Sequence, residues 1–231
     1  MEELKYITIA HKLNSENHSL LLKNKLHFRG NVKSMSLISL AKENPEIGLS
    51  NIKTEETALL KLAKVISGEI VFEKNRDTRE KELQAWVIHD ALTKNKKLYF
   101  DNQLEFITSE LALYENKNRI VNDILAIDDK GNLVVVELKS TRDKQRIELQ
   151  VANFINIINK NKTFFFKLVE TIANKQWNGN TNGIVVWNDS REMKRVINKD
   201  YREICYFEKG AKGKKLIDYD SNDNIQFIEI L

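Results

Sequence analysis

Cysteine is almost absent from this chain, with Cys205 the only one among 231 residues. A single cysteine excludes a disulfide within the chain and any zinc site built on several thiolates, so we expect neither fold nor chemistry to depend on thiols. Proline is equally scarce, and the setting of Pro45 in KENPEIG indicates a turn rather than a linker between domains. The four histidines show no metal-ligand spacing such as HExxH, which argues against a histidine-based metal site.

Long apolar runs are also missing, because no segment approaches the roughly 20 apolar residues of a membrane-spanning helix. The start, MEELKYITIAHKLNSENHS, lacks the charged and then apolar plan of a signal peptide. We therefore expect a cytoplasmic protein with no membrane partner. The composition, 42% hydrophobic and 30% charged, is typical of a globular protein, and the formal net charge of +4 permits a nucleic-acid partner without demonstrating one.

Two regions of the chain differ in pattern. Within the first 75 residues, YITIAHKL, SLLLKNKLHF and GEIVFEK alternate like strands, whereas KTEETALLKLAKVIS has helical spacing. This predicts a small α/β or α+β N-terminal region, residues 1–75, whose role is unknown and could be substrate recognition or dimerisation. A polar run over residues 73–80 is expected to separate it from a second domain, residues 76–231.

The second region alternates helical and strand-like patterns. A helix is expected after Thr78, with Leu83, Val87 and Ala91 on its apolar stripe. Further helices are predicted over residues 144–159, in TFFFKLVETIAN and in REMKRVINK. Strands are predicted in LEFITSELALYENK, NRIVNDILAI, NLVVVELKS, GIVVW, REICYFEK and IQFIEIL. This alternation predicts an α/β domain.

Charged residues interrupt NRIVNDILAIDDKGNLVVVELKST, whose apolar pattern otherwise predicts sheet core. Gly131 suits the third place of a three-residue hairpin loop, and that register brings Asp123 opposite Glu137. Because side chains alternate along a strand, Lys139 shares a face with Glu137. Facing carboxylates repel each other, and a divalent cation such as Mg²⁺ would offset the repulsion. The alternative is a cluster of these charges on a solvated sheet face.

The spacing of these residues also resembles a known signature. The pattern resembles the catalytic motif of the PD-(D/E)XK nuclease superfamily, in which an aspartate (here Asp123) is followed, after thirteen further residues, by Glu-x-Lys (here Glu137-Leu138-Lys139). The whole block IVNDILAIDDKGNLVVVELKS is similar to the corresponding block of NucS-type (DUF91-like) endonucleases. The resemblance spans roughly residues 78–190. It implies a restriction-endonuclease-like core, with a mixed central sheet flanked by helices, and Mg²⁺- or Mn²⁺-dependent endonuclease activity on DNA.

The resemblance also implies roles for individual residues. Asp123 and Glu137 would be metal ligands, the backbone carbonyl of Leu138 would be a further ligand, and Lys139 would orient or activate the attacking water. Glu80, which with Leu83 meets the family's E-x-x-L pattern, would complete the site as a catalytic residue and metal ligand. Glu82 is its rival, although Glu80 lies in better register with the apolar stripe of the helix.

The resemblance also makes Gln150 a candidate catalytic residue, because the helix after the signature often carries glutamine in the family. Gln150 is a lone polar residue in an apolar helical stripe that includes Val151 and Ile158, so it needs a partner such as a catalytic carboxylate or a backbone group. Two positions depart from the family pattern. Phe154 stands where many members carry tyrosine, and Asn122 stands where the superfamily's name places proline. Neither departure removes an implied metal ligand.

Basic residues near the signature are candidates for binding nucleic acid, namely Arg119, Arg142, Lys144 and Arg146. A second basic cluster, in EKGAKGKK, contains Lys209, Lys212, Lys214 and Lys215. Three alternatives stay open: a catalytically inactive nucleic-acid-binding module on the same fold, a nuclease that acts on RNA, and a structural or interaction domain. A homodimer would supply the two sites needed to cut both strands, but no sequence feature fixes it.

Overall fold

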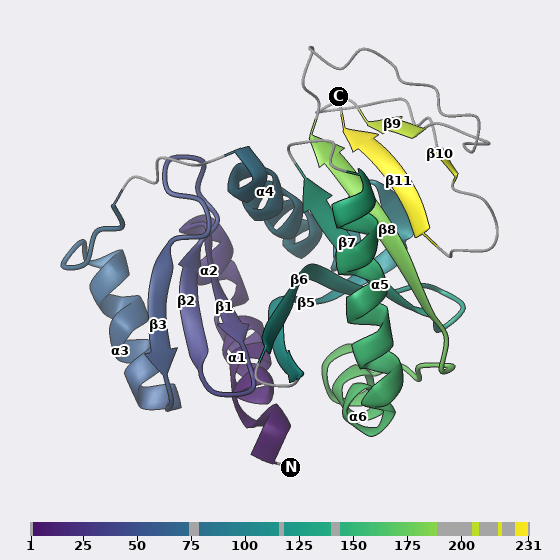
Figure 1. Ribbon diagram of the computed structural model, residues 1–231. Helices are drawn as coiled ribbons and strands as arrows, with labels where there is room; N and C mark the ends of the chain where they lie inside the picture. The colour runs from purple at the N-terminus through teal and green to yellow at the C-terminus, as the bar shows by residue number, and fades with distance from the viewer. Residues whose placement is uncertain are drawn as a thin grey trace.

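The computed structural model describes residues 2–73, 79–115, 118–139, 144–188, 205–207, 217–218 and 225–230. It has a mixed α/β architecture with two sheets, one small and antiparallel, the other larger and mixed (Figure 1). Within the described ranges, none of the helices is long and apolar enough to cross a membrane.

The small sheet and its helices are formed by the N-terminal residues. β1 pairs antiparallel with β2, and β2 pairs antiparallel with β3. In chain order the elements are η1 (Glu2–Leu4), α1 (Lys5–Glu16), α2 (His18–Lys23), β1 (Leu26–Gly30), β2 (Met35–Ser39), β3 (Gly48–Ile52) and α3 (Glu55–Ile66). Leu13 of α1 and Leu62 of α3 pack with Phe28 and Leu37 in one core, so both helices cover the same face of the sheet.

The structure confirms the helix predicted in KTEETALLKLAKVIS, where Thr54 caps α3 by accepting the N–H of Thr57 at 3.2 Å. The strand predicted in YITIAHKL is wrong, because these residues lie in α1. Its buried residues Ile7, Ala10 and Leu13 recur every three positions, a helical spacing that the local alternation obscured. SLLLKNKLHF is divided between α2 and β1, and residues 68–73 of GEIVFEK form no strand.

The larger sheet has the strand order β10-β11-β8-β7-β6-β5-β4, with β9 paired to β11. The neighbours from β4 to β7 are antiparallel, whereas β7 with β8 and β8 with β11 are parallel. Its strands are β4 (Lys97–Leu98), β5 (Asp101–Glu115), β6 (Asn118–Ile127), β7 (Leu133–Lys139), β8 (Thr181–Asn188), β9 (Cys205–Phe207), β10 (Ile217–Asp218) and β11 (Ile225–Ile230). The strand predictions for this region are confirmed, and the helix predicted in REMKRVINK lies outside the described residues.

Helices cover both faces of this sheet. They are α4 (Arg79–Thr93), α5 (Lys144–Lys160) and α6 (Lys162–Ala173). On β7, Val134 and Val136 share a core with α4, whereas Leu133 and Val135 share the opposite core with α5 and α6. Burial on both faces explains why β7 has a continuous apolar run. The expected mixed sheet flanked by helices is therefore present.

The N-terminal residues also contribute to both cores of the larger sheet. Ile38 and Leu40 pack on the α4 side, and Ile7 of α1 packs on the α5 and α6 side. Figure 1 places the small sheet beside the end of α4 and next to β5 and β6. The two parts of the chain therefore share these cores. The division into domains of residues 1–75 and 76–231 stays a prediction.

Candidate active site

The β6–β7 hairpin has the register that the sequence predicts. The Asp128 N–H donates to the Asn132 carbonyl at 3.0 Å, and Gly131 has a φ of +83° in the loop between them. The paired residues run from Ile127 with Leu133 to Ile124 with Val136. One step further along the same register, Asp123 stands opposite Glu137, at the point where this ladder ends.

Asp123 is held by the backbone of β7. Its Oδ2 accepts the N–H of Leu138 at 2.7 Å, in place of a ladder bond from β6. The N–H and C=O of one strand residue point to the same neighbouring strand, so the Leu138 carbonyl also faces the β6 side. The Asp123 carboxylate and the Leu138 carbonyl, the proposed metal ligand, thus both lie where β6 and β7 stop pairing.

Lys139 lies among carboxylates. Its Nζ is 2.8 Å from Glu137 Oε1 and 3.2 Å from Glu80 Oε1, and the three side chains are 15%, 5% and 39% exposed, respectively. Glu80 comes from the first turn of α4, whereas the other two continue the row of Leu133 and Val135 on β7. The start of α4 therefore brings a third acid to the end of the β6–β7 hairpin.

Burial dominates the electrostatics of this group. It raises the pKa of Asp123 well above its usual value, and the charge of Glu137 raises it further, against the lowering effects of Lys139 and the Leu138 N–H. Burial likewise raises the pKa of Glu137, although Lys139 opposes the shift. For Lys139, burial lowers the pKa, but Glu137, Asp123 and Glu80 outweigh it and leave it raised. The site thus holds an ammonium ion among acids that are costly to ionise.

The donor set fits a hard cation with few protein ligands. Asp123, Glu137 and the Leu138 carbonyl offer only oxygen atoms, and Mg²⁺ is typically held by one or two carboxylates with waters and substrate phosphates. Among the described residues, no three His, Cys, Asp or Glu side chains come close enough together to form a metal cage. Glu80 contacts the Lys139 amine instead. An ion bound here would therefore be shared by two carboxylates.

The remaining predicted residues lie at different places. Glu82, two residues after Glu80 on α4, is partly buried, and Arg119 is exposed on β6. Gln150 is exposed rather than buried in the apolar stripe of α5, and its approach to the site stays a prediction. The other basic candidates lie outside the described part of the chain. They are the side chains of Arg142, Lys144 and Arg146 and the basic cluster of Lys209, Lys212, Lys214 and Lys215.

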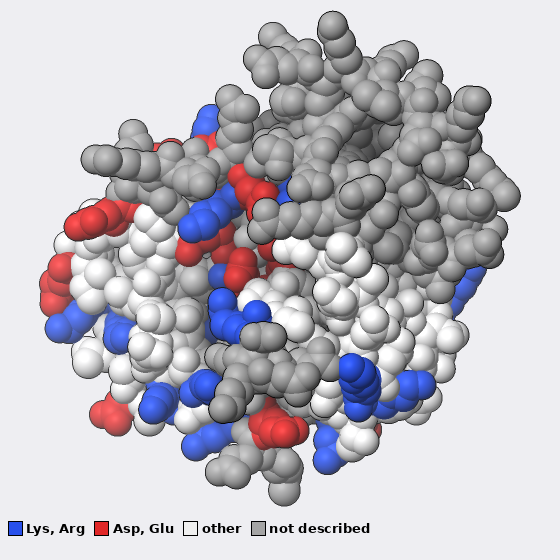
Figure 2. Space-filling view, in the orientation of Figure 1, with Lys and Arg blue, Asp and Glu red and all other residues white. Residues whose placement is uncertain are grey.

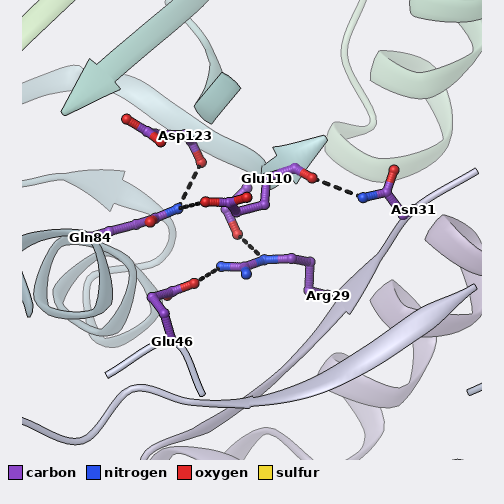
Figure 3. A network of polar contacts seen from close by, with 7 residues as sticks. Arg29, Asn31, Glu46, Gln84, Glu110 and Asp123 are labelled. Atoms are coloured by element: carbon purple, nitrogen blue, oxygen red, sulfur yellow. Dashed lines mark hydrogen bonds and ion pairs between the residues drawn. The ribbon is translucent and has the colours of Figure 1, made fainter. Parts of the chain in front are cut away.

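Sequence reasoning missed a polar network behind Asp123. Gln84 of α4, 3% exposed, donates through Nε2 to both the Asp123 carbonyl and Glu110 Oε1, each at 3.3 Å (Figure 3). Glu110 lies on β5 with a φ of +50°, and its charge contributes to raising the pKa of Asp123. An amide from α4 therefore links the backbone of the candidate metal ligand to a neighbouring acid.

The same network reaches the small sheet. Asn31, directly after β1, donates to the Glu110 carbonyl at 2.8 Å, and Arg29 donates through Nε to Ser109 Oγ at 2.9 Å (Figure 3). Arg29 also forms a buried ion pair with Glu46. Figure 2 shows acidic and basic side chains gathered between the small sheet and the larger one. The N-terminal residues are therefore hydrogen-bonded to β5, the strand that pairs with the Asp123 strand β6.

Two sequence signals could have pointed to this network. Gln84 lies four residues before Ile88 on the buried face of α4, where a polar side chain needs a partner. Thr108, Ser109 and Glu110 are three consecutive polar residues between apolar parts of β5, a break typical of an irregular strand. Arg29 and Asn31 carry no such signal, because their partners are about 80 residues away.

Asn122 is a second feature that sequence reasoning left unexplained. It is 1% exposed, and among the described residues neither polar atom of its amide has a hydrogen-bond partner. It precedes Asp123 and therefore points to the opposite face of β6. A buried amide without partners is costly for the fold, so its presence beside the site is consistent with a role outside folding stability.

Comparison of the chain with protein-family models and with curated protein sequences gives no match.

Proposed function

We propose that this chain is a metal-dependent endonuclease of the PD-(D/E)XK type that hydrolyses phosphodiester bonds of DNA. The observation that carries the proposal is the convergence of Asp123 and Glu137 at the open end of a hairpin, with the Lys139 amine 2.8 Å from Glu137. The mixed sheet with helices on both faces is consistent with a restriction-endonuclease-like core.

The raised pKa values of Asp123 and Glu137 support a role for a cation. Two acids buried side by side destabilise the fold unless something compensates their charges, and residues with shifted pKa values cluster at functional sites. A bound Mg²⁺ or Mn²⁺ would stabilise charge on the scissile phosphate and lower the pKa of the attacking water. Asp123, Glu137 and the Leu138 carbonyl are the residues that would hold it.

Lys139 and Glu80 would assist the reaction beside the metal ligands. The ammonium group of Lys139 can donate to the attacking water or to a phosphate oxygen, and preorganised charge of this kind stabilises developing negative charge. The Lys139 Nζ is 3.2 Å from Glu80 Oε1, and this contact holds the amine toward α4. Glu80 would position Lys139, and the metal role implied by the family resemblance would require it to move toward Asp123.

The polyanionic substrate would be bound by basic residues around this centre. Arg119 is exposed on β6, four residues before Asp123, which suits contact with a backbone phosphate. We assign the same role to Arg142, Lys144 and Arg146. Since none of these contacts reads the sugar, RNA is the alternative substrate, and cutting both strands of a duplex would require a homodimer.

A second candidate is a catalytically inactive nucleic-acid-binding module. The observation that favours it is that Lys139 is already paired with Glu137 and Glu80, an arrangement that can serve folding alone. The two functions differ in their response to metal. A nuclease needs the cation for turnover, whereas a module that binds phosphates needs none.

The deciding experiment is incubation of the purified protein with labelled single-stranded, duplex, branched and mismatched DNA, and with RNA, in the presence of Mg²⁺, Mn²⁺ or chelator. We expect metal-dependent cleavage that Asp123→Ala or Glu137→Ala abolishes, while Lys139→Ala slows it by several orders of magnitude. Binding without cleavage by the wild type would favour the inactive module. Cleavage that persists in Asp123→Ala would place the activity elsewhere.

A further inference from the structure

A cavity of about 200 Å³ lies where the N-terminal residues meet the larger sheet. Its walls come from α1, β1, the turn after α4, and β5. Apolar residues such as Ile7 and Phe106 form much of the lining, and Lys96, His11 and His27 are the polar side chains that matter most. The volume is below the roughly 300–1,000 Å³ of pockets for drug-sized ligands, so only a small molecule fits.

Lys96 brings a positive charge to this cavity without a matching negative one. Its Nζ is 3.2 Å from His11 Nε2 and 3.5 Å from the Ile172 carbonyl, and among the described residues it makes no salt bridge. The acid that influences it, Glu105, is itself paired with Lys175 at 3.0 Å. Burial accordingly lowers the pKa of Lys96, as expected for a cation moved out of water without an anion beside it.

The backbone holds Lys96 in an unfavourable conformation. The N–H of Lys96 donates to the Ala91 carbonyl at 2.8 Å, which closes the end of α4. Asn95 and Lys96 have φ values of +51° and +67°. Asparagine is common in this region after a helix, but lysine is not, and such strain is maintained where surrounding structure or function requires it.

His27 provides a second and independent sign of a ligand. Only 6% of it is exposed, yet its ring makes no hydrogen bond to any described residue. It lies edge-on to Phe106, with ring centroids 6.0 Å apart, and lines the cavity. Burial lowers the pKa of His27 to about 3, so the neutral ring keeps one donor and one acceptor nitrogen that lack partners.

We infer that this cavity binds a small oxyanion, a phosphate or a short carboxylate, whose charge pairs with Lys96 and whose oxygen atoms hydrogen-bond to His27. The site is separate from the Asp123–Glu137 pair and does not depend on the proposed nuclease activity. An anion here would bridge the N-terminal residues, through His11 and His27, to the turn after α4. The apolar part of the lining would accommodate the carbon atoms of a carboxylate.

The test uses the whole chain in metal-free buffer at constant ionic strength. Inorganic phosphate and acetate are titrated separately by calorimetry, with chloride as the reference anion. We expect saturable binding to one site by at least one of the two probes, accompanied by a rise in the melting temperature. Preference for phosphate or for acetate identifies the ligand class, and binding by neither overturns the inference.

Variants and a spectroscopic readout locate the bound anion. Lys96→Met should weaken binding about tenfold or more, because it removes a hydrogen bond to a charged group. Lys97→Met is the matched control, since Lys97 is paired with Asp129 at 3.1 Å outside the cavity, and it should bind like the wild type. If Lys96→Met fails to fold, imidazole NMR of the wild type decides: the His11 and His27 signals should shift with the probe while that of His89 does not. Unchanged affinity in folded Lys96→Met, or unmoved His27 signals, would overturn the inference.

Discussion

The carboxylate of Asp123 accepts the backbone N–H of Leu138 at 2.7 Å, across the end of the β6–β7 hairpin. This bond joins a side chain of one strand to the residue between Glu137 and Lys139 on the next. Together with the β6–β7 ladder, this contact fixes the candidate ligands of both strands relative to one another. Because an amide oxygen can accept the same N–H, the charge at position 123 can be removed without losing this contact.

Asp123→Asn should therefore stabilise the fold at neutral pH. The pKa of Asp123 in the folded protein is raised above the ordinary 3.8, so its stabilising contribution is present at low pH and is lost as pH rises through the folded value. The gain of the variant over the wild type should grow as pH rises, measured by urea unfolding at several pH values. Mg²⁺ should raise the melting temperature of the wild type only. A variant that becomes relatively less stable as pH rises would contradict this account.

Glu80→Gln should slow cleavage about 10–100-fold, the usual loss when a group that orients a site residue is removed. The reason is its contact with Lys139 at 3.2 Å. Glu82→Gln makes the same chemical change in the same helical turn and should leave the rate close to that of the wild type. Equal rates for the two variants would mean that Glu80 is only a first-turn charge of α4.

Arg29→Met should destabilise the fold by about 3–5 kcal/mol, because it leaves the Glu46 carboxylate buried without its partner. The Glu46 side chain is only 4% exposed, and burial raises its pKa even beside Arg29. The double variant Arg29→Met/Glu46→Gln should recover much of the loss in denaturant unfolding. If the double variant is as unstable as the single one, the contact of Arg29 with Ser109 matters more than the ion pair.

His27 should make stability depend on pH. Its pKa is about 3 in the folded protein and 6.5 ordinarily, so the unfolded state binds the proton more tightly between these values. Stability attributable to His27 is present above the unfolded pKa and falls as pH decreases from about 6.5, by up to about 1.4 kcal/mol per pH unit. Unfolding curves of His27→Leu should have a shallower slope in this range. Identical slopes would show that other groups set the acid sensitivity.

Asn122→Leu should stabilise the fold by about 1–3 kcal/mol, since it removes a buried amide whose polar atoms have no partner in the described part of the chain. If Asn122 serves the reaction, the same variant should cleave more slowly while it binds Mg²⁺ normally. The measurements are thermal unfolding and single-turnover cleavage. Loss of stability would mean that the amide has a partner in solution, such as a buried water.

The parts of the fold that could be predicted depend on residues close together in the sequence. Gly131 and the alternation around it fix the β6–β7 register, so Asp123, Glu137 and Lys139 could be placed from nearby residues alone. The prediction of a strand over residues 6–13 was wrong because this segment alternates in polarity only locally. The helix depends on packing of Ala10 and Leu13 in the core of the small sheet and of Ile7 in a core of the larger one. Tertiary packing overrides short patterns of this kind.

The surroundings of the site were not predictable from local patterns. Arg29 and Asn31 reach β5 across about 80 residues of sequence, and no spacing rule connects such positions. The exposure of Gln150 has a different cause. A stripe that includes Val151, Phe154 and Ile158 fixes which side of α5 is buried, but position 150 lies at the margin of that side, where either outcome is compatible with the pattern.

The bonds from Arg29 and Asn31 to β5 also limit how this protein can be divided. A fragment beginning near residue 76 would lose the donor to the Glu110 carbonyl and would expose the apolar surface that Ile38 and Leu40 cover. Such a fragment would have fewer restraints on β5 behind Asp123, and hydrogen exchange there should accelerate. The first 75 residues therefore cannot be replaced by an unrelated domain without loss of these contacts. A chimaera joined at this boundary would need residues that make the same hydrogen bonds to β5.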